Sequence, residues 1–95
     1  MIRNVVLGRL RDGVDRSEIE PGLAAIAALH PDGLLASRIG TDLRLRDQTW
    51  DFAITNDFVD VEAYRRYDLD DEHNRIRHEQ FAPLCADIAR VQFEC

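Results

Sequence analysis

The sequence predicts an α+β fold of the ferredoxin-like β-α-β-β-α-β type, with an antiparallel sheet that carries its helices on one face. Three observations support this prediction. The expected elements follow that order, the strands show a period of two in apolar residues, and two stretches show helical spacing. The chain has 95 residues and no internal repeat. This size fits one domain, residues 1–95.

Residues 2–10, IRNVVLGRL, predict the first strand because β-branched residues alternate along it. One face carries Ile2, Asn4, Val6, Gly8 and Leu10. The other face carries Arg3, Val5, Leu7 and Arg9. The glycine-containing RDGVD at 11–15 predicts a turn after this strand.

A helix is expected over 17–30, where apolar residues recur at helical spacing and form one stripe: Ile19, Leu23, Ile26 and Leu29. Ser17-x-x-Glu20 has the pattern of a capping box at its start. Alternatively, Pro21 occupies the first turn of a helix that begins nearer Glu20. The HPDG sequence at 30–33 ends the helix.

Residues 34–45 predict an extended segment, one strand that is broken or bulged near Gly40. RDQT at 46–49 turns the chain, and WDFAITNDF at 50–58 alternates again as a third strand. Five of its side chains are expected on one face: Trp50, Phe52, Ile54, Asn56 and Phe58.

In the last third of the chain, Asp60 is expected to cap a short helix over 61–67. A second helical stretch is expected over 71–84, where Pro83 marks its end. Residues 86–95 predict the last strand.

The expected sheet leaves one face without helices. Both faces of the first strand are apolar, Val5 and Leu7 on one and Val6 and Leu10 on the other. A domain of this size also buries only a small core. We therefore expect a homodimer formed through the open sheet face.

Charge and composition argue against several classes of protein. The net charge is −6 and all twelve basic residues are arginine, which disfavours nucleic acid and anionic membrane surfaces as partners. No signal-peptide pattern or membrane-spanning run is seen. Cys85 and Cys95 form no disulfide framework: we expect a small core residue and a frayed, free thiol, respectively. A cytoplasmic location is expected.

Three stretches resemble a known family: IRNVVLGRLRDGVD, WDFAITNDFVDVEAYRRY and DDEH. They are similar to the stress-responsive A/B barrel domain (Dabb), and the similarity covers nearly the whole chain. It implies a dimeric α+β barrel, two ferredoxin-like subunits joined through their sheets. Many members of this family are stress-induced or uncharacterised, and some are polyketide cyclases.

The resemblance also implies a reaction pocket. In cyclase-type members a tyrosine six residues before a helical histidine contributes to it, and Tyr67 and His73 match that pair. The chain departs from the family at other positions. Asn4 and Phe52 stand where histidines are common, and DDEH lacks the usual proline before the histidine.

The residues themselves suggest proton transfer rather than metal binding. His73 and His78 are five residues apart, which turns them by about 140° from each other on a regular helix, so no metal site and no cofactor are expected. His73 can act as a general base near neutral pH, and Tyr67 can donate a hydrogen bond to a carbonyl oxygen. Asn4 can add a neutral hydrogen bond. Each of these side chains can equally have a purely structural role.

The expected pocket lies between the sheet and the helices, and its other candidate lining residues are Asn4, Val6, Gly8, Leu23, Ile26, Phe52 and Ile54. Gly8 leaves room for a ligand, unless Trp50 or Phe81 fills that space.

Three functions remain open from the sequence. The first is a homodimer of uncharacterised role that binds a small, partly apolar or aromatic molecule. The second is a polyketide cyclase-like or isomerase-like enzyme with His73 as general base and Tyr67 as hydrogen-bond donor. The third is a purely structural stress protein. Haem-degrading monooxygenases share the barrel architecture, so fold analogy leaves that activity open as well.

Overall fold

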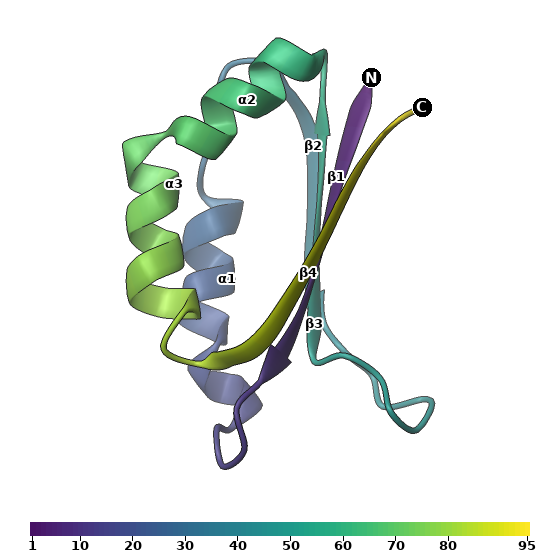
Figure 1. Ribbon diagram of the computed structural model, residues 1–95, viewed down its shortest axis with the longest axis vertical. Helices are drawn as coiled ribbons and strands as arrows, with labels where there is room; N and C mark the ends of the chain where they lie inside the picture. Colours follow the sequence, from purple (N-terminus) through teal and green to yellow (C-terminus); the bar gives the residue numbers. More distant parts are fainter.

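The structure, a computed structural model, describes all residues 1–95 and has the expected order of elements. The four strands and the helical segments are β1 (Ile2–Leu10), η1 (Arg16–Glu18), α1 (Glu20–Ala27), β2 (Leu34–Thr41), β3 (Phe52–Phe58), α2 (Val61–Leu69), α3 (Asp71–Ile76), η2 (Arg77–Phe81) and β4 (Cys85–Glu94). One antiparallel sheet has the strand order β2-β3-β1-β4. All helices lie on one side of it (Figure 1). The predicted ferredoxin-like fold is therefore confirmed.

The core lies between the sheet and the helices. Alternate residues of β3 are buried there, among them Phe52, Ile54 and Phe58. The stripe predicted for the first helix faces them, with Leu23 and Ile26 buried. Cys85, at the start of β4, is buried in the same cluster, as expected for a small core residue.

The space above Gly8 is filled by a side chain of the neighbouring strand. A Cβ atom added at Gly8 would lie 2.0 Å from Cζ of Phe52. The Phe52 ring thus occupies the room that we expected either a ligand, Trp50 or Phe81 to take. The ring of Phe81 packs beside it, with a centroid distance of 5.7 Å.

The first helix begins later than the capping-box pattern predicted. Asp15, not Ser17, is the capping residue, and it caps the short helix η1: its carboxylate accepts from Ser17 N at 3.1 Å, and its own N–H donates to Glu18 at 2.7 Å. The helix α1 starts at Glu20 and ends at Ala27. Pro21 lies in its first turn, where its missing N–H leaves no helical hydrogen bond unmade, so the alternative start was correct.

The second strand begins at Leu34 as predicted, but its irregularity and its end lie elsewhere than expected. Its irregularity lies between Leu34 and Ala36, whereas Gly40 pairs regularly with Ala53. The strand ends at Thr41, where the chain leaves the sheet and enters a loop. Asp51 holds the far end of this loop against β1, because its carboxylate accepts from Leu10 N at 2.7 Å. In Figure 1 this loop projects beyond the sheet.

Trp50 does not face the core as predicted. It precedes β3, and the guanidinium of Arg9 lies 4.2 Å from the centroid of its ring. The N–H of the next residue, Asp51, is bound to the carbonyl of Gly8 at 2.8 Å. Trp50 therefore pairs with the side of β1 that faces away from the helices.

The last helical stretch is not a single α-helix over 71–84. The helix α3 continues into the π-helical segment η2, where Ala82 N donates to the carbonyl of Arg77 at 2.9 Å. This five-residue step widens the turn, and such turns are often found at functional sites. The structure therefore places Arg77 and Phe81 differently from a regular helix.

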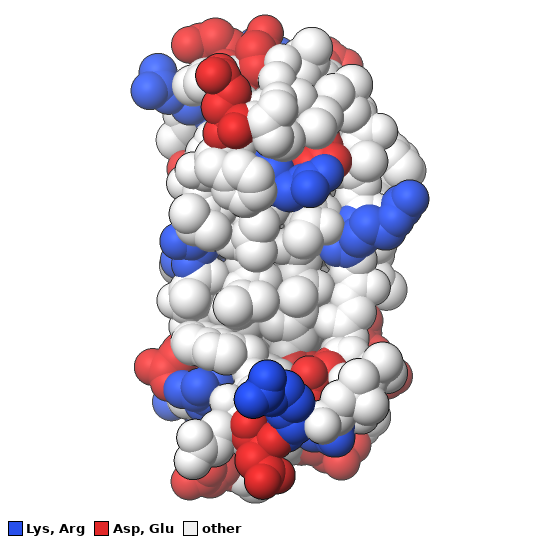
Figure 2. Space-filling view, turned by 90° about the vertical axis from the view of Figure 1, so that its right-hand side faces the viewer, with Lys and Arg blue, Asp and Glu red and all other residues white.

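The other face of the sheet, here called the open face, carries no helix. Its apolar centre consists of Val5, Leu7, Ala53, Ala89, Val91 and Phe93. Figure 2 shows this face with its charged residues mostly at the two ends and an uncharged band between them. Val91 and Phe93 are 54% and 45% exposed. No helix has the length and apolar character needed to cross a membrane.

Cys95 is better held than we expected of a frayed end. Its thiol is free and exposed, but its backbone N–H donates to the carbonyl of Met1 at 2.9 Å.

Candidate functional site

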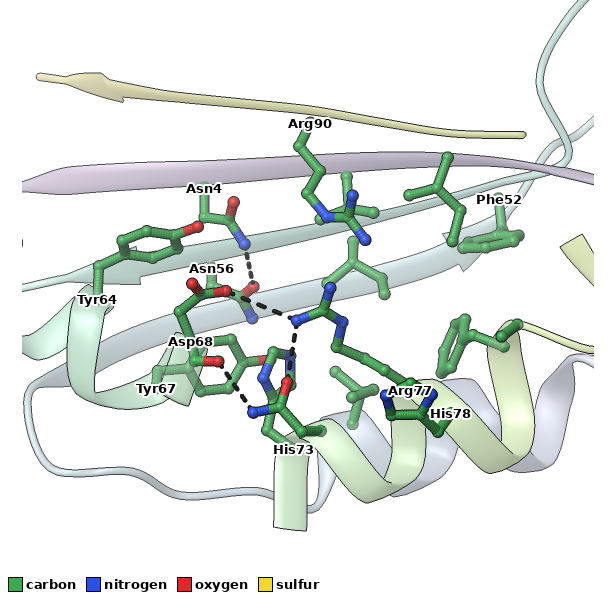
Figure 3. A pocket seen from close by; sticks show the side chains of 17 residues that line it. Asn4, Phe52, Asn56, Tyr64, Tyr67, Asp68, His73, Arg77, His78 and Arg90 are labelled. Carbon is green, nitrogen blue, oxygen red and sulfur yellow. Dashed lines mark hydrogen bonds and ion pairs between the residues drawn. The ribbon is translucent and has the colours of Figure 1, made fainter. Parts of the chain in front are cut away.

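A cavity of about 220 Å³ lies between the sheet and the helices α2, α3 and η2 (Figure 3). One group of its lining residues is apolar: Val6, Ile26, Phe52, Ile54, Phe81, Ala82 and Ile88. The second group is polar or aromatic: Asn4, Asn56, Tyr64, Tyr67, Asp68, His73, Asn74, Arg77, His78 and Arg90. Its size suits a small molecule rather than a large cofactor.

Most of the residues that the sequence suggested do meet in this cavity: Asn4, Val6, Ile26, Phe52, Ile54, Tyr67 and His73. Gly8 and Leu23 do not line it. Gly8 is covered by the Phe52 ring, and Leu23 lies within the main core cluster.

His73 is buried and sits at the first turn of α3. The carboxylate of Asp70 caps this helix by accepting from His73 N at 2.9 Å. The residue is only 8% exposed, and the Nδ1 atom of its side chain is buried without any hydrogen-bond partner. Burial and then the positive charge of Arg77 lower the pKa of His73, although Asp68, Asp70 and the backbone of Tyr67 act against this. The imidazole is therefore neutral at neutral pH.

Tyr67 lies directly against His73, and the ring centroids are 4.0 Å apart. The ring of Phe58 also packs against Tyr67, with the ring centroids 5.1 Å apart. Burial raises the pKa of Tyr67 to about 12. The phenol thus keeps its proton at neutral pH and can act only as a donor or a neutral acceptor.

A polar ladder crosses all four strands beneath the cavity. Gln92 of β4 donates to Asn4 at 2.9 Å, and Asn4 donates to Asn56 of β3 at 3.1 Å. Asn56 in turn donates to Ser37 of β2 at 3.1 Å. Asn4 and Asn56 are both buried. Their amides are engaged with each other, which holds them in place rather than leaving Asn4 wholly free for a ligand.

Sequence reasoning missed several polar residues of the cavity. Asn56 shares the inward face of β3 with Phe52 and Ile54, so its alternation could have pointed to it. Arg77 and Arg90 gave no such signal, because arginines are usually read as surface residues. His78 is exposed as predicted, yet it also lines the cavity.

No three His, Cys, Asp or Glu side chains come together in a way that could hold a metal ion. The donors in the cavity are instead amides, phenols, imidazoles and guanidiniums.

The chain matches the family described as Stress responsive A/B Barrel Domain over residues 2–95. No protein with a curated description matches it significantly.

Solved structures with the same fold include a dimeric ferredoxin-like protein of unknown function from Thermobifida fusca. It is 28% identical, with a TM-score of 0.87, over 99% of this chain and 90% of that chain. A hydroxynitrile lyase from Passiflora edulis is 19% identical, with a TM-score of 0.81, over 97% and 90%. A cofactor-independent oxygenase from Streptomyces nogalater is 18% identical, with a TM-score of 0.79, over 99% and 91%.

Proposed function

This chain belongs to the Stress responsive A/B Barrel Domain family, and we propose that it is a homodimer that binds a small, partly apolar molecule between its sheet and its helices. The observation that carries this proposal is the cavity, which combines apolar lining residues with buried polar ones, among them Asn4, Tyr67 and His73. An interior that served stability alone would be filled, and a buried imidazole nitrogen without a partner would be costly there.

The dimer is supported by the open face. An exposed apolar sheet face is a typical subunit interface, and the related protein from Thermobifida fusca is described as dimeric. Pairing through that face leaves the cavity, on the opposite face, accessible to a ligand.

The test of ligand binding uses benzylacetone, a small neutral aryl ketone, in an NMR titration of the isotope-labelled protein. We expect saturable shifts at residues that line the cavity. In the Ile88→Trp variant the new ring fills the cavity and should abolish these shifts. Leu69→Trp is the matched control because Leu69 is exposed on α2, away from the cavity.

Native mass spectrometry of the purified protein reports the subunit count and any retained molecule in the same experiment. Shifts that are unchanged in Ile88→Trp, or that never saturate, would contradict a binding cavity.

A second candidate function is proton transfer next to a carbonyl group, of the cyclase or isomerase kind. It is favoured by the pairing of a neutral imidazole with a phenol that keeps its proton, His73 beside Tyr67. The imidazole would take a proton from the carbon next to the carbonyl. The electron pair would move to the carbonyl oxygen, which the Tyr67 hydroxyl stabilises by donating a hydrogen bond.

The same ketone tests this chemistry. In D2O, proton abstraction followed by return of a deuteron exchanges the hydrogens beside the carbonyl of benzylacetone. We expect His73→Ala to remove the catalysed exchange, and Tyr67→Phe to slow it by roughly a hundredfold. His30→Ala is the control, because His30 is exposed and does not line the cavity, and unfolding curves check that the variants fold. Exchange that survives His73→Ala shows that this mechanism is wrong, without affecting the binding proposal.

A further inference from the structure

The cavity has the opposite charge to the protein as a whole. The chain carries a net charge of −6. Its cavity is lined by two guanidiniums, Arg77 and Arg90, and by one carboxylate, Asp68. Among these three side chains, two positive charges and one negative charge leave an excess of one positive charge. An acidic chain that keeps unbalanced arginines in its cavity has a local attraction for anions.

Arg90 supplies the unbalanced charge. It lies on β4 opposite Val6, on the side of the sheet that faces the helices. None of the eight salt bridges in the structure includes it. Its guanidinium therefore has no anionic partner in the protein.

Arg77 approaches from the opposite wall and is only partly engaged. Its Nη1 atom donates to Asn74 at 3.0 Å and lies 3.7 Å from the carboxylate of Asp68. These contacts fix the side chain through one nitrogen only. The Nη2 and Nε donors remain for another group.

The two guanidiniums point toward the same part of the cavity, one from β4 and one from the helical segment (Figure 3). Tyr64 lines the same cavity: burial and then Asp68 raise its pKa, whereas Arg90 and Arg77 act to lower it.

We propose that Arg77 and Arg90 bind the carboxylate of a small apolar acid whose body fills the rest of the cavity. This inference rests on the proposed binding function and names its ligand class. Two guanidiniums that converge on one place repel each other until an anion lies between them, and the planar fork of arginine matches a carboxylate. The nearby Asp68 disfavours a doubly charged phosphate, because its own charge repels the second negative charge.

The test compares two ligands of nearly equal shape, hydrocinnamate and its neutral amide hydrocinnamamide, by NMR titration. We expect the acid to bind at least roughly tenfold more tightly than the amide. Arg90→Gln and Arg77→Gln should each weaken the acid by about tenfold and change the amide less than twofold. Arg90→Lys, which keeps the charge, should recover part of the loss.

The control is Arg65→Gln, since Arg65 is exposed on α2 and pairs only with Glu62. Arg90 is exposed, so folding of its variants is checked simply by their unfolding curves. Inorganic phosphate serves as a third ligand, and it should bind more weakly than the acid.

Each outcome decides a different point. Equal binding of acid and amide, unaffected by the arginine variants, overturns the carboxylate site and leaves the binding cavity in place. Phosphate that binds as tightly as hydrocinnamate shows a general anion site and also overturns the proposal. If hydrocinnamate, its amide and benzylacetone all fail to bind, the proposed function fails together with this inference.

Discussion

At the scale of single residues, His73 combines a buried position with an ionisable group. Its unpartnered nitrogen and its stacking on Tyr67 make it the most unusual histidine of the chain. Such a residue usually marks a site rather than a structural contact, because burial without a partner lowers stability. The same burial makes its effect measurable through pH.

We expect the free energy of unfolding to decrease as the pH is lowered below 6.5, in part because of His73. Its folded-state pKa lies below the ordinary 6.5, so the unfolded chain binds the proton first as the pH decreases. The contribution is complete above pH 6.5 and is lost as the pH falls toward the folded-state value. Urea unfolding between neutral and mildly acidic pH should show a shallower decrease for His73→Gln than for the native protein.

The control for this pH experiment is His30→Gln, because His30 is exposed in the segment that follows α1. It should keep the native pH dependence. If His73→Gln leaves the pH dependence of the free energy of unfolding unchanged, the imidazole takes up a proton equally well in the folded and unfolded states.

Some of the cavity residues could be predicted from the sequence and others could not. Tyr67 and His73 were suggested by a family pattern and do meet, because α2 and α3 are joined only through Asp70. The place of Arg90 in the cavity lining could not be predicted, since an arginine on a last strand is ordinarily a solvated side chain. Its importance depends on which groups the fold places opposite it.

At the scale of elements, the strands were easier to predict than the helices. Each of β1 and β3 has one buried face, so alternation of apolar residues fixed both its existence and its orientation. The prediction of a single last helix was wrong because a π turn has no simple sequence signature. The prediction that Trp50 faces the core was wrong because Trp50 lies in the loop before β3, where the period of the strand does not set the direction of the side chain.

The polar ladder offers a test at this scale. Asn4→Val removes the acceptor of Gln92 and the donor to Asn56 Oδ1. Because this buried oxygen is then left without a partner, the free energy of unfolding should fall by about 1–3 kcal/mol. Adding Asn56→Val should restore most of that loss, because two apolar side chains then face each other across the strands. Denaturant unfolding of the single and double variants measures both steps.

The remaining ladder residues do not complicate this comparison, since Gln92 is exposed and Ser37 is half-buried, so both can bind water. If the double variant Asn4→Val/Asn56→Val is less stable than Asn4→Val alone, the ladder itself stabilises the fold.

At the scale of the whole molecule, the open face should hold the dimer together. Val91 lies opposite Val5 at the apolar centre of this face, and Val91→Asp would bury a charge in the interface. We expect this variant to sediment as a monomer under conditions where the native chain is dimeric. Leu69→Asp, on the outer surface of α2, should remain a dimer.

A native chain that sediments as a monomer at all concentrations would contradict the dimer and would leave the cavity proposal to be judged on ligand binding alone. Family resemblance implies the dimer, while the sequence itself offers two reasons to expect it: the two apolar faces of β1 and the small core of a domain of this size.

The polar ladder also bears on how the chain avoids misfolding. Alternation of apolar residues distinguishes the two faces of a strand, but it cannot detect a slip by two residues, because every side chain then returns to the correct face. The hydrogen bond between Asn4 and Asn56 distinguishes the two registers of the β1–β3 pair. A two-residue slip there would place Asn4 opposite Ile54 or Phe58 and leave its amide without this partner. The ladder thus acts as a register check, rejecting mispaired sheets that hydrophobic burial alone would accept.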